Sequence, residues 1–432
     1  MAAAIPKATT RATIPVVLVL TIPPKERELE DEREAEMKSL LDTAGRSVVA
    51  TLTQHLQKPV GATYLGSGKI EELAALLKSS GADQAVFDTQ LSPRQQRNLT
   101  KEVEGDVLDY NQIILDIFAR NARTAQAMLA VELAQMVYNR SRLKRMWTHL
   151  DRLGGGGSGG SSAVRGAGEK QIEVDKRLVR DRIIELRERL ETIEKRRERT
   201  VAARGDCFNI ALVGYTNAGK STLMNALTHA GVLAEDRLFA TLDTRTAQVH
   251  LEGVPNAVLS DTVGFIRNLP PTLIASFHAT LAEVREADLL LHVIDCASPS
   301  MDEQVASVEK VLDAIGAAKI PTIMVFNKID RTYSKAILLA YRRRYADSVE
   351  ISALSGDGLD QLKVMIAAQA AAQLTTLTVR FDAKDGALNA FLRSRARVAD
   401  ESYDGETAQL TLAADVRLID EIRAHPGLTI VS

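Results

Sequence analysis

Residues Gly214 to Thr222 read GYTNAGKST, and this stretch decides the fold around it. An apolar run, Phe208 to Gly214, precedes it, and the residues STLMNALTHA continue as a helix. A strand, the pattern GxxxxGKS and a helix, in that order, predict a phosphate-binding loop, because glycines let backbone amides face phosphate oxygens. The first helical turn adds positive potential. We expect Lys220 to reach the terminal phosphates and the Ser221 hydroxyl to ligate Mg²⁺.

Two later motifs also stand at the ends of apolar runs. AVLSDTVG ends at Gly264, and there we expect Asp261 to hold Mg²⁺ and the Gly264 amide to sense the γ-phosphate. PTIMVFNKID ends at Asp330, whose carboxylate can accept two hydrogen bonds from the N1–H and the exocyclic amine of guanine. Adenine lacks this pair of donors, so the motif favours GTP over ATP.

Three further features surround the base. Asn327 is expected to hold the base and the loop, and Lys328 to lie over the ring. The run SVEISAL ends in Ser352, Ala353 and Leu354, where a backbone amide can meet the guanine oxygen.

A switch threonine is expected between the phosphate-binding loop and DTVG, in the segment DRLFATLDTRTAQVHL. A switch needs a hydroxyl that reaches Mg²⁺ only when the γ-phosphate is present. We favour Thr241; Thr244 and Thr246 are the alternatives, and an ordinary loop threonine is the remaining interpretation.

The residue after DTVG is Phe265. Many regulatory GTPases place a glutamine there to orient the attacking water, which phenylalanine cannot do. We therefore expect slow intrinsic hydrolysis, raised when a partner reorders the loop Phe265–Thr272.

Length and composition limit the class of protein to which the chain can belong. With 432 residues, 45% hydrophobic and 25% charged, the chain is an ordinary globular protein of two or three domains. Its net charge of −2 means that any nucleic-acid contact needs a local basic patch. Cys207 and Cys296 form no CxxC pair, which favours a reducing cytoplasm over a disulfide framework or a zinc site. The apolar stretch Ile14 to Ile22 is too short to span a bilayer and is interpreted as a buried strand.

Two segments alternate strands with helices. Residues 14–110 predict a small α/β domain, with strands VVLVLTI, SVVATLTQ, QAVFD and GDVLDY and helices from Glu30, Gly68 and Ser92. Residues 206–372 predict a P-loop GTPase domain, an α/β fold with a mostly parallel sheet and helices on both faces.

The remaining segments differ in character. Residues 1–13 are expected to be a disordered tail. Residues 111–204 predict a long helical hairpin that links the two α/β domains, with a glycine-rich loop at 154–162. Residues 374–432 read strand, helix, two strands, helix and strand, which predicts a small ferredoxin-like α+β domain.

The hairpin prediction rests on two long helical patterns. The first runs from Asn111 to Leu150 and the second from about Glu169 to Arg199. The second has apolar residues in a heptad seam, at Ile172, Val179, Ile183, Leu186, Leu190 and Ile193.

Basic residues concentrate before the glycine-rich loop. The stretch Asn139 to Arg152 has one acidic residue, Asp151, against Arg140, Arg142, Lys144, Arg145 and Arg152. One interpretation is a solvated helix face with extended side chains. The other is a contact with phosphates, aided by Trp147 and His149. The sequence leaves both open.

Beyond these motifs, nearly the whole chain resembles the HflX family, in the Obg–HflX group of P-loop GTPases. The resemblance rests on GSGKIEEL (66–73), LSPRQQRNL (91–99), LDIFARNARTAQAMLAVELAQM (115–136), MWTHLDR (146–152), RGAGEKQIEVDKRLVRDRI (165–183), GYTNAGKSTLMNAL, FATLD and DTVGFIRNLP. The chain departs from the family at Ala167 and Thr244, where a proline is usual, and in its longer, serine-rich glycine loop.

The resemblance implies a GTPase that acts on the large ribosomal subunit and splits stalled or stressed ribosomes. It gives the basic hairpin region Arg140–Arg165 a use as a contact for ribosomal RNA. We expect a cytoplasmic protein with no DNA partner and no stable membrane insertion, monomeric away from the ribosome. A switch that regulates a protease or a membrane complex stays an alternative, and Asp330 argues against an ATP-driven RNA remodeller.

The expected cofactors are GTP or GDP and Mg²⁺. The candidate catalytic residues are Lys220, Thr241 and Gly264. The candidate Mg²⁺ ligands are Ser221, Thr241 and Asp261. With the family's nucleotide-binding segments carried over, the candidate nucleotide-binding residues are Gly214, Tyr215, Thr216, Asn217, Ala218, Gly219, Lys220, Ser221, Thr222, Phe239, Ala240, Thr241, Leu242, Asp243, Asp261, Thr262, Val263, Gly264, Asn327, Lys328, Ile329, Asp330, Ser352, Ala353 and Leu354.

Overall fold

The chain packs into two compact units, and each is described by itself. The computed structural model describes residues 13–153, 176–193, 195, 207–228, 239, 245–267, 281–331, 333–414, 418–419, 422–423, 425 and 427–431. The first unit comprises residues 1–193 with two later segments, 235–243 and 267–279. The second comprises residues 194–234, 244–266 and 280–432. The domain boundaries expected from the sequence, such as those at 110 and 372, stay predictions.

A four-stranded parallel sheet forms the core of the first unit. Its order is β2-β1-β3-β4, with β1 at Ile14–Ile22, β2 at Arg46–His55, β3 at Gln84–Phe87 and β4 at Asp106–Leu108. Seven consecutive residues of β1 are buried, as expected for a parallel strand covered on both faces. The prediction of an α/β domain with these four strands is confirmed.

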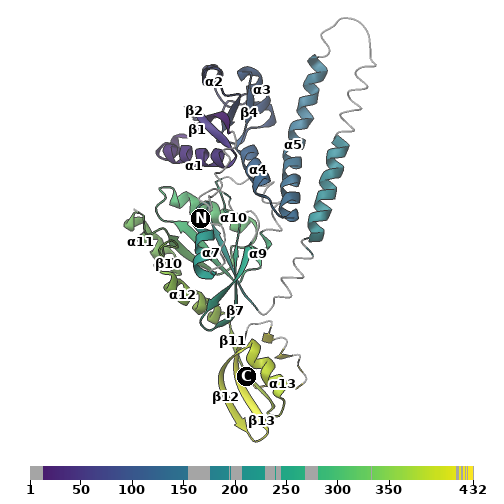
Figure 1. The fold of residues 1–432 in the computed structure, drawn as a ribbon, viewed down its shortest axis with the longest axis vertical. Helices are drawn as coiled ribbons and strands as arrows, with labels where there is room; N and C mark the ends of the chain where they lie inside the picture. The colour runs from purple at the N-terminus through teal and green to yellow at the C-terminus, as the bar shows by residue number, and fades with distance from the viewer. Residues whose placement is uncertain are drawn as a thin grey trace, which may run out of the picture. The chain divides into compact units, whose positions relative to one another are not determined.

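Helices cover this sheet in two pairs (Figure 1). They are α1 (Glu30–Thr43) with α4 (Tyr110–Asn121), and α2 (Ser67–Ser80) with α3 (Pro93–Val103). Helix α3 begins with a capping box, in which Ser92 and Gln95 each accept from the other's backbone amide. A short 3₁₀ helix, Pro24–Leu29, precedes α1.

The long helical pattern predicted from Asn111 to Leu150 is two helices, and the single-helix expectation is wrong. Helix α4 ends at Asn121, and α5 runs from Ala125 to Leu153. The backbone of Ala122 is extended, and the Thr124 hydroxyl caps the new helix by accepting from the Ala127 amide at 3.1 Å. No glycine or proline marks this break, so the periodicity concealed it.

The second helical pattern is observed at residues 176–193, beside α5 (Figure 1). The seam residues Ile183, Leu186 and Leu190 are buried, whereas Ile184 is 46% exposed. Across the pair, the Arg182 guanidinium donates to Glu132 at 2.6 Å. These contacts confirm a helical hairpin in the described part of the chain; Ile172 and the glycine-rich loop 154–162 lie outside the described residues.

A six-stranded sheet forms the core of the second unit, in the order β10-β9-β8-β5-β7-β6. All pairs are parallel except that of β6 with β7. The strands are β5 (Phe208–Gly214), β6 (Arg245–Leu251), β7 (Val254–Asp261), β8 (Leu289–Asp295), β9 (Thr322–Asn327) and β10 (Ser348–Glu350). The helices are α7 (Lys220–Thr228), α9 (Ala282–Arg285), α10 (Met301–Ala314), α11 (Lys335–Arg344) and α12 (Leu359–Ala372). The prediction of a mostly parallel GTPase-type sheet is confirmed.

The last part of the chain forms an antiparallel sheet in the order β12-β13-β11-β14. The elements are β11 (Thr375–Asp382), α13 (Gly386–Arg395), β12 (Arg397–Asp404), β13 (Thr407–Ala414) and β14 (Thr429–Ile430). Leu418, Ile419 and Ile422 pack into the same core. The strand order and the single described α-helix after the first strand agree with the predicted ferredoxin-like domain. Within the described residues, no helix is long and apolar enough to cross a membrane.

We predict that Leu186→Ala loosens the helical hairpin. The Leu186 side chain is fully buried, and truncating a buried leucine costs about 2–5 kcal/mol. Ile184→Ala is the matched control, because that side chain is largely exposed. Amide hydrogen exchange at residues 176–193 of the full-length protein should accelerate in L186A and stay unchanged in I184A. Equal exchange in both variants would contradict the seam.

Candidate nucleotide-binding site

Parallel pairing brings the sequence motifs to one edge of the six-stranded sheet. Strands β5, β7 and β9 end at Gly214, Asp261 and Asn327. These are the first residues of the phosphate-binding loop, of DTVG and of NKID, respectively. Ligands of open α/β sheets bind outside the carboxyl ends of the strands. The structure therefore gathers the phosphate-binding loop, DTVG and NKID at such an edge.

The phosphate-binding loop has its lysine folded back over it. Lys220 is the first residue of α7, and its Nζ donates to the carbonyls of Gly214 at 3.1 Å and Tyr215 at 2.8 Å. Burial lowers the pKa of Lys220 to about 8, and the nearby Asp261 charge opposes this shift. A buried ammonium group at this place is well suited to an anionic phosphate.

Two glycines are needed because other groups approach them closely. Gly219 has a φ of +97°, and a Cβ there would lie 2.2 Å from Nδ2 of Asn327. A Cβ on Gly264 would lie 2.8 Å from Cγ2 of Thr216 and 3.0 Å from Nζ of Lys220. DTVG thus packs directly against the phosphate-binding loop, and a side chain at Gly264 would force these two segments apart. A side chain at Gly219 would instead displace Asn327 of the NKID motif.

Two of the three candidate Mg²⁺ ligands lie together. The Ser221 hydroxyl donates to Oδ2 of Asp261 at 2.7 Å, and Asp261 is completely buried. Hydroxyl and carboxylate oxygens are the donors that Mg²⁺ prefers, so these residues fit the ion. Thr241, the third candidate, lies outside the described residues, as does its rival Thr244. Thr246 lies on β6 and contacts the Ser260 hydroxyl at 3.3 Å.

A serine orients the carboxylate expected to read guanine. The Ser352 hydroxyl donates to Oδ1 of Asp330 at 2.6 Å, and this hydrogen bond lowers the pKa of Asp330. Ser352 itself is fully buried. The carboxylate is therefore ionised at neutral pH and held in one orientation, as acceptance of two N–H donors requires.

The NKID motif is tied to both neighbouring loops. The Asn327 side chain donates to the Ala218 carbonyl at 2.8 Å and accepts from the Ala353 amide at 2.9 Å. The Ala353 amide, one candidate for the guanine oxygen, is thus engaged with Asn327 in this structure. Leu354 is 81% exposed.

Sequence reasoning missed a partner of Lys328. Its Nζ donates to the Asn217 carbonyl at 2.7 Å, which lays the side chain along the phosphate-binding loop. The same Nζ forms an ion pair with Asp295 at 2.6 Å, with both side chains less than one-fifth exposed. Asp295 ends β8, a parallel strand paired with β9, and this position was the available signal.

Phe265 is held away from any role in orienting water. Its side chain is 1% exposed. Its amide donates to the Gly214 carbonyl at 3.1 Å, and its carbonyl accepts from the Thr216 amide at 2.7 Å. The residue after DTVG is therefore locked to the phosphate-binding loop through its backbone.

One candidate nucleotide-binding residue packs in the first unit instead. The ring of Phe239 meets that of Phe118 edge-on, with centroids 4.7 Å apart, and its carbonyl accepts from the Asn121 side chain at 2.9 Å. These contacts occupy both its side chain and its carbonyl. The other candidates of this segment, Ala240 to Asp243, lie outside the described residues.

Comparison with known proteins covers most of the chain. Three family models match: the GTP-binding GTPase N-terminal domain at 31–119, the GTP-binding GTPase middle region at 121–204 and the 50S ribosome-binding GTPase at 209–328. The GTPase HflX of Magnetococcus marinus is 45% identical over 88% of this chain and 88% of its own length. The GTPase HflX of Escherichia coli K12 is 42% identical over 92% of each chain. The chain belongs to the HflX family of GTPases.

The comparison with solved structures gives a more distant match. A GTP-binding protein from Sulfolobus solfataricus, solved in complex with GDP, is 24% identical and aligns with a TM-score of 0.43. The alignment covers 82% of this chain and 98% of that one.

We predict that Asp330→Asn changes the base preference of this HflX-family GTPase from guanine to xanthine. The amide loses an acceptor for the guanine donors, and hydrogen bonds to charged groups contribute about 1.5–3 kcal/mol each. The Kd for GDP should rise by about a hundredfold or more. Xanthosine diphosphate has a carbonyl in place of the amine and should bind D330N better than the parent protein. Asp360→Asn, at a fully exposed side chain, is the control for both measurements by titration calorimetry.

A second prediction concerns Asp295. Asp295→Asn removes the ion pair that holds Lys328, so the dissociation of a fluorescent GDP analogue should accelerate by up to about tenfold. Stopped-flow displacement measures this rate. Asp347→Asn, at an exposed position, should leave it unchanged. An unaltered rate in D295N would show that Lys328 needs no such partner.

Proposed function

We propose that this GTPase binds the large ribosomal subunit in its GTP-bound state and splits stalled or stressed ribosomes in the cytoplasm. The observation that carries the proposal is the burial of Phe265 and its two backbone bonds to the phosphate-binding loop. Because this position cannot orient water, the group that does so must come from elsewhere in the chain or from a partner. A GTPase of this kind hydrolyses slowly until its partner completes the site.

We assign roles to the chain's own residues as follows. Lys220 neutralises the terminal phosphates, and the Gly264 amide senses the γ-phosphate. Ser221, Asp261 and Thr241 would hold Mg²⁺, which would supply positive charge to offset that of the phosphates. Asp330 selects guanine. Of these residues, Thr241 is assigned from the switch argument and the family resemblance, because it lies outside the described residues.

The large subunit is favoured as partner by two observations. The family model that matches residues 209–328 is described as a 50S ribosome-binding GTPase. Phe239 and Arg267, which flank nucleotide motifs in the chain, belong to the first unit, which also contains the basic helix α5. There the Tyr110 hydroxyl donates to the Arg267 carbonyl at 3.1 Å, and Asn121 holds Phe239. A change in the position of Phe239 or Arg267 on hydrolysis would thus reach the first unit, which contains the proposed RNA-binding element.

The proposal predicts co-sedimentation with large subunits in a non-hydrolysable GTP analogue and its loss in GDP. GTP turnover should rise by about tenfold or more when large subunits are added. Intact ribosomes incubated with the protein and GTP should separate into subunits on a sucrose gradient. Lys220→Ala, which removes the phosphate-binding cation, is the control for all three readouts.

Absence of nucleotide-dependent sedimentation at low salt would overturn ribosome binding. Turnover that is equal with and without subunits would overturn the role given to the partner. Sedimentation without subunit separation would leave a ribosome-bound GTPase and refute splitting.

A further inference from the structure

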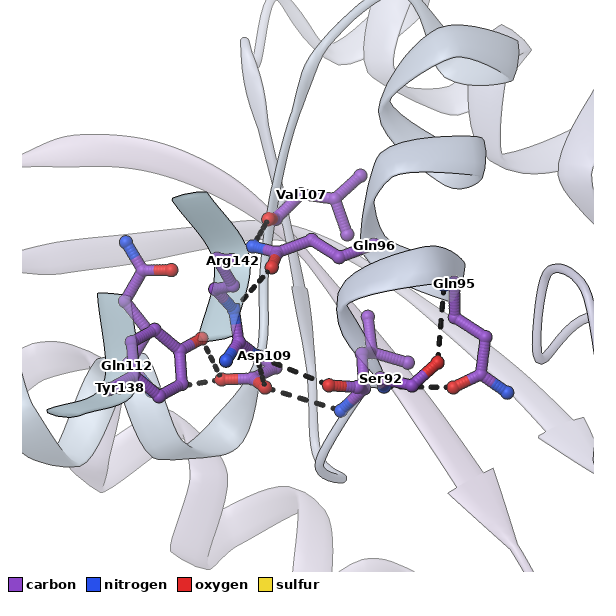
Figure 2. A network of polar contacts seen from close by, with 9 residues as sticks. Ser92, Gln95, Gln96, Val107, Asp109, Gln112, Tyr138 and Arg142 are labelled. Carbon is purple, nitrogen blue, oxygen red and sulfur yellow. Dashed lines mark hydrogen bonds and ion pairs between the residues drawn. The ribbon is translucent and has the colours of Figure 1, made fainter. Parts of the chain in front are cut away.

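A cluster of polar side chains joins helix α5 to the sheet of the first unit (Figure 2). At its centre is Asp109, which directly precedes α4 and is completely buried. Its carboxylate accepts hydrogen bonds from the amides of Leu91 at 3.2 Å and Gln112 at 3.0 Å. It also accepts from the Tyr138 hydroxyl at 2.8 Å and the Arg142 guanidinium at 2.7 Å. We call these five residues the Asp109 cluster.

Arg142 is occupied on several sides within this cluster. Its Nε donates to Oε1 of Gln96 at 2.7 Å, and its Nη2 also reaches the Leu91 carbonyl at 3.2 Å. Its guanidinium lies over the Tyr138 ring, 3.5 Å from the centroid. The Arg142 side chain is only 14% exposed. One side chain of α5 therefore connects the loop before α3, helix α3 and the junction of β4 with α4.

The buried Asp109 carboxylate makes it energetically costly for Arg142 to leave the cluster. Burial raises the pKa of Asp109, and the Arg142 charge opposes that shift. If Arg142 turned toward a phosphate, it would leave a buried carboxylate without its counter-charge, which is strongly unfavourable. The sequence left open whether the basic residues before the glycine-rich loop contact phosphates. For Arg142, these contacts favour a role in the interior of the protein.

Arg140 provides the contrast. It lies two residues earlier on the same helix and is exposed, so its charge is available to a partner. The two arginines look alike in the sequence, and only burial separates them.

Because of the position of Arg142 along α5, the Asp109 cluster can influence the direction of the rest of the helix. Helix α5 continues to Leu153, eleven residues beyond Arg142, which is roughly 16 Å of helix. A small change in angle at Arg142 is amplified at the far end of such a lever. Resting on the proposed function, we propose that Arg142 is a positioning residue, which sets the direction of α5 through Asp109 and thereby presents the basic end of the hairpin to ribosomal RNA without touching it.

The test compares the salt dependence of binding to large subunits in the presence of a non-hydrolysable GTP analogue. Each lost phosphate contact lowers the slope of log K against log salt by about one. Arg140→Gln should lower this slope, because it removes an available charge. Arg142→Lys keeps the charge but cannot make the forked contacts to Asp109, Gln96 and the Leu91 carbonyl. R142K should therefore bind about tenfold more weakly with an unchanged slope.

Tyr138→Phe is the milder variant, in case R142K fails to fold. It removes only the hydroxyl that donates to Asp109 and keeps the ring beneath the guanidinium. Tyr138 carries no positive charge and is 8% exposed, so a loss of affinity with an unchanged slope in Y138F cannot come from a phosphate contact. GDP affinity should equal that of the parent protein in every variant, which confirms an intact nucleotide domain.

The outcomes separate the two proposals. If the parent protein fails to bind large subunits, the proposed function fails and this inference falls with it. If the parent binds and Arg142→Gln lowers the slope as Arg140→Gln does, Arg142 is a phosphate contact and the positioning role is refuted. If R142K and Y138F bind as tightly as the parent, the Asp109 cluster has no part in presenting the hairpin.

Discussion

The nucleotide site depends on the packing of Asn327 against the phosphate-binding loop. Its side chain donates to the Ala218 carbonyl, and Gly219 has no room for a Cβ beside it. This contact is possible because parallel pairing of the strands between them places both loops at one edge of the sheet. The base-reading and phosphate-binding motifs, more than one hundred residues apart in the chain, are held together by backbone geometry.

In the first unit, buried ion pairs hold together segments that are distant in the sequence. Asp88 follows β3 and Asp109 follows β4, so both carboxylates stand at the carboxyl edge of the parallel sheet. Each is paired with an arginine from a helix at 2.7 Å, Arg33 of α1, which covers the sheet, and Arg142 of α5, which packs on α3 and α4. Such pairs add little net stability, but breaking one is costly, and so they specify how helices sit on a sheet.

Features with a local signature could be predicted from the sequence. The four N-terminal strands and the GTPase motifs were identified correctly. Apolar runs that alternate with helical stretches indicate strands, and the spacing of glycines indicates a backbone that must approach phosphates. The break between α4 and α5 could not be predicted from the sequence, because Thr124 caps the new helix and no glycine or proline lies nearby. Asp295 was missed and the role of Arg142 was left open, because their partners are distant in the sequence, at Lys328 and Asp109.

By itself, the sequence determined that this chain is a P-loop GTPase, and it predicted that Asp330 reads guanine and that Phe265 stands where a water-orienting residue would be. Those conclusions follow from side-chain chemistry at fixed spacing. Only the tertiary structure decided which charges are available to a partner. Arg140 and Arg142 are chemically identical, yet one is exposed and the other neutralises a buried carboxylate. The reason is physical: burial depends on what packs against a residue, and no local pattern contains that information.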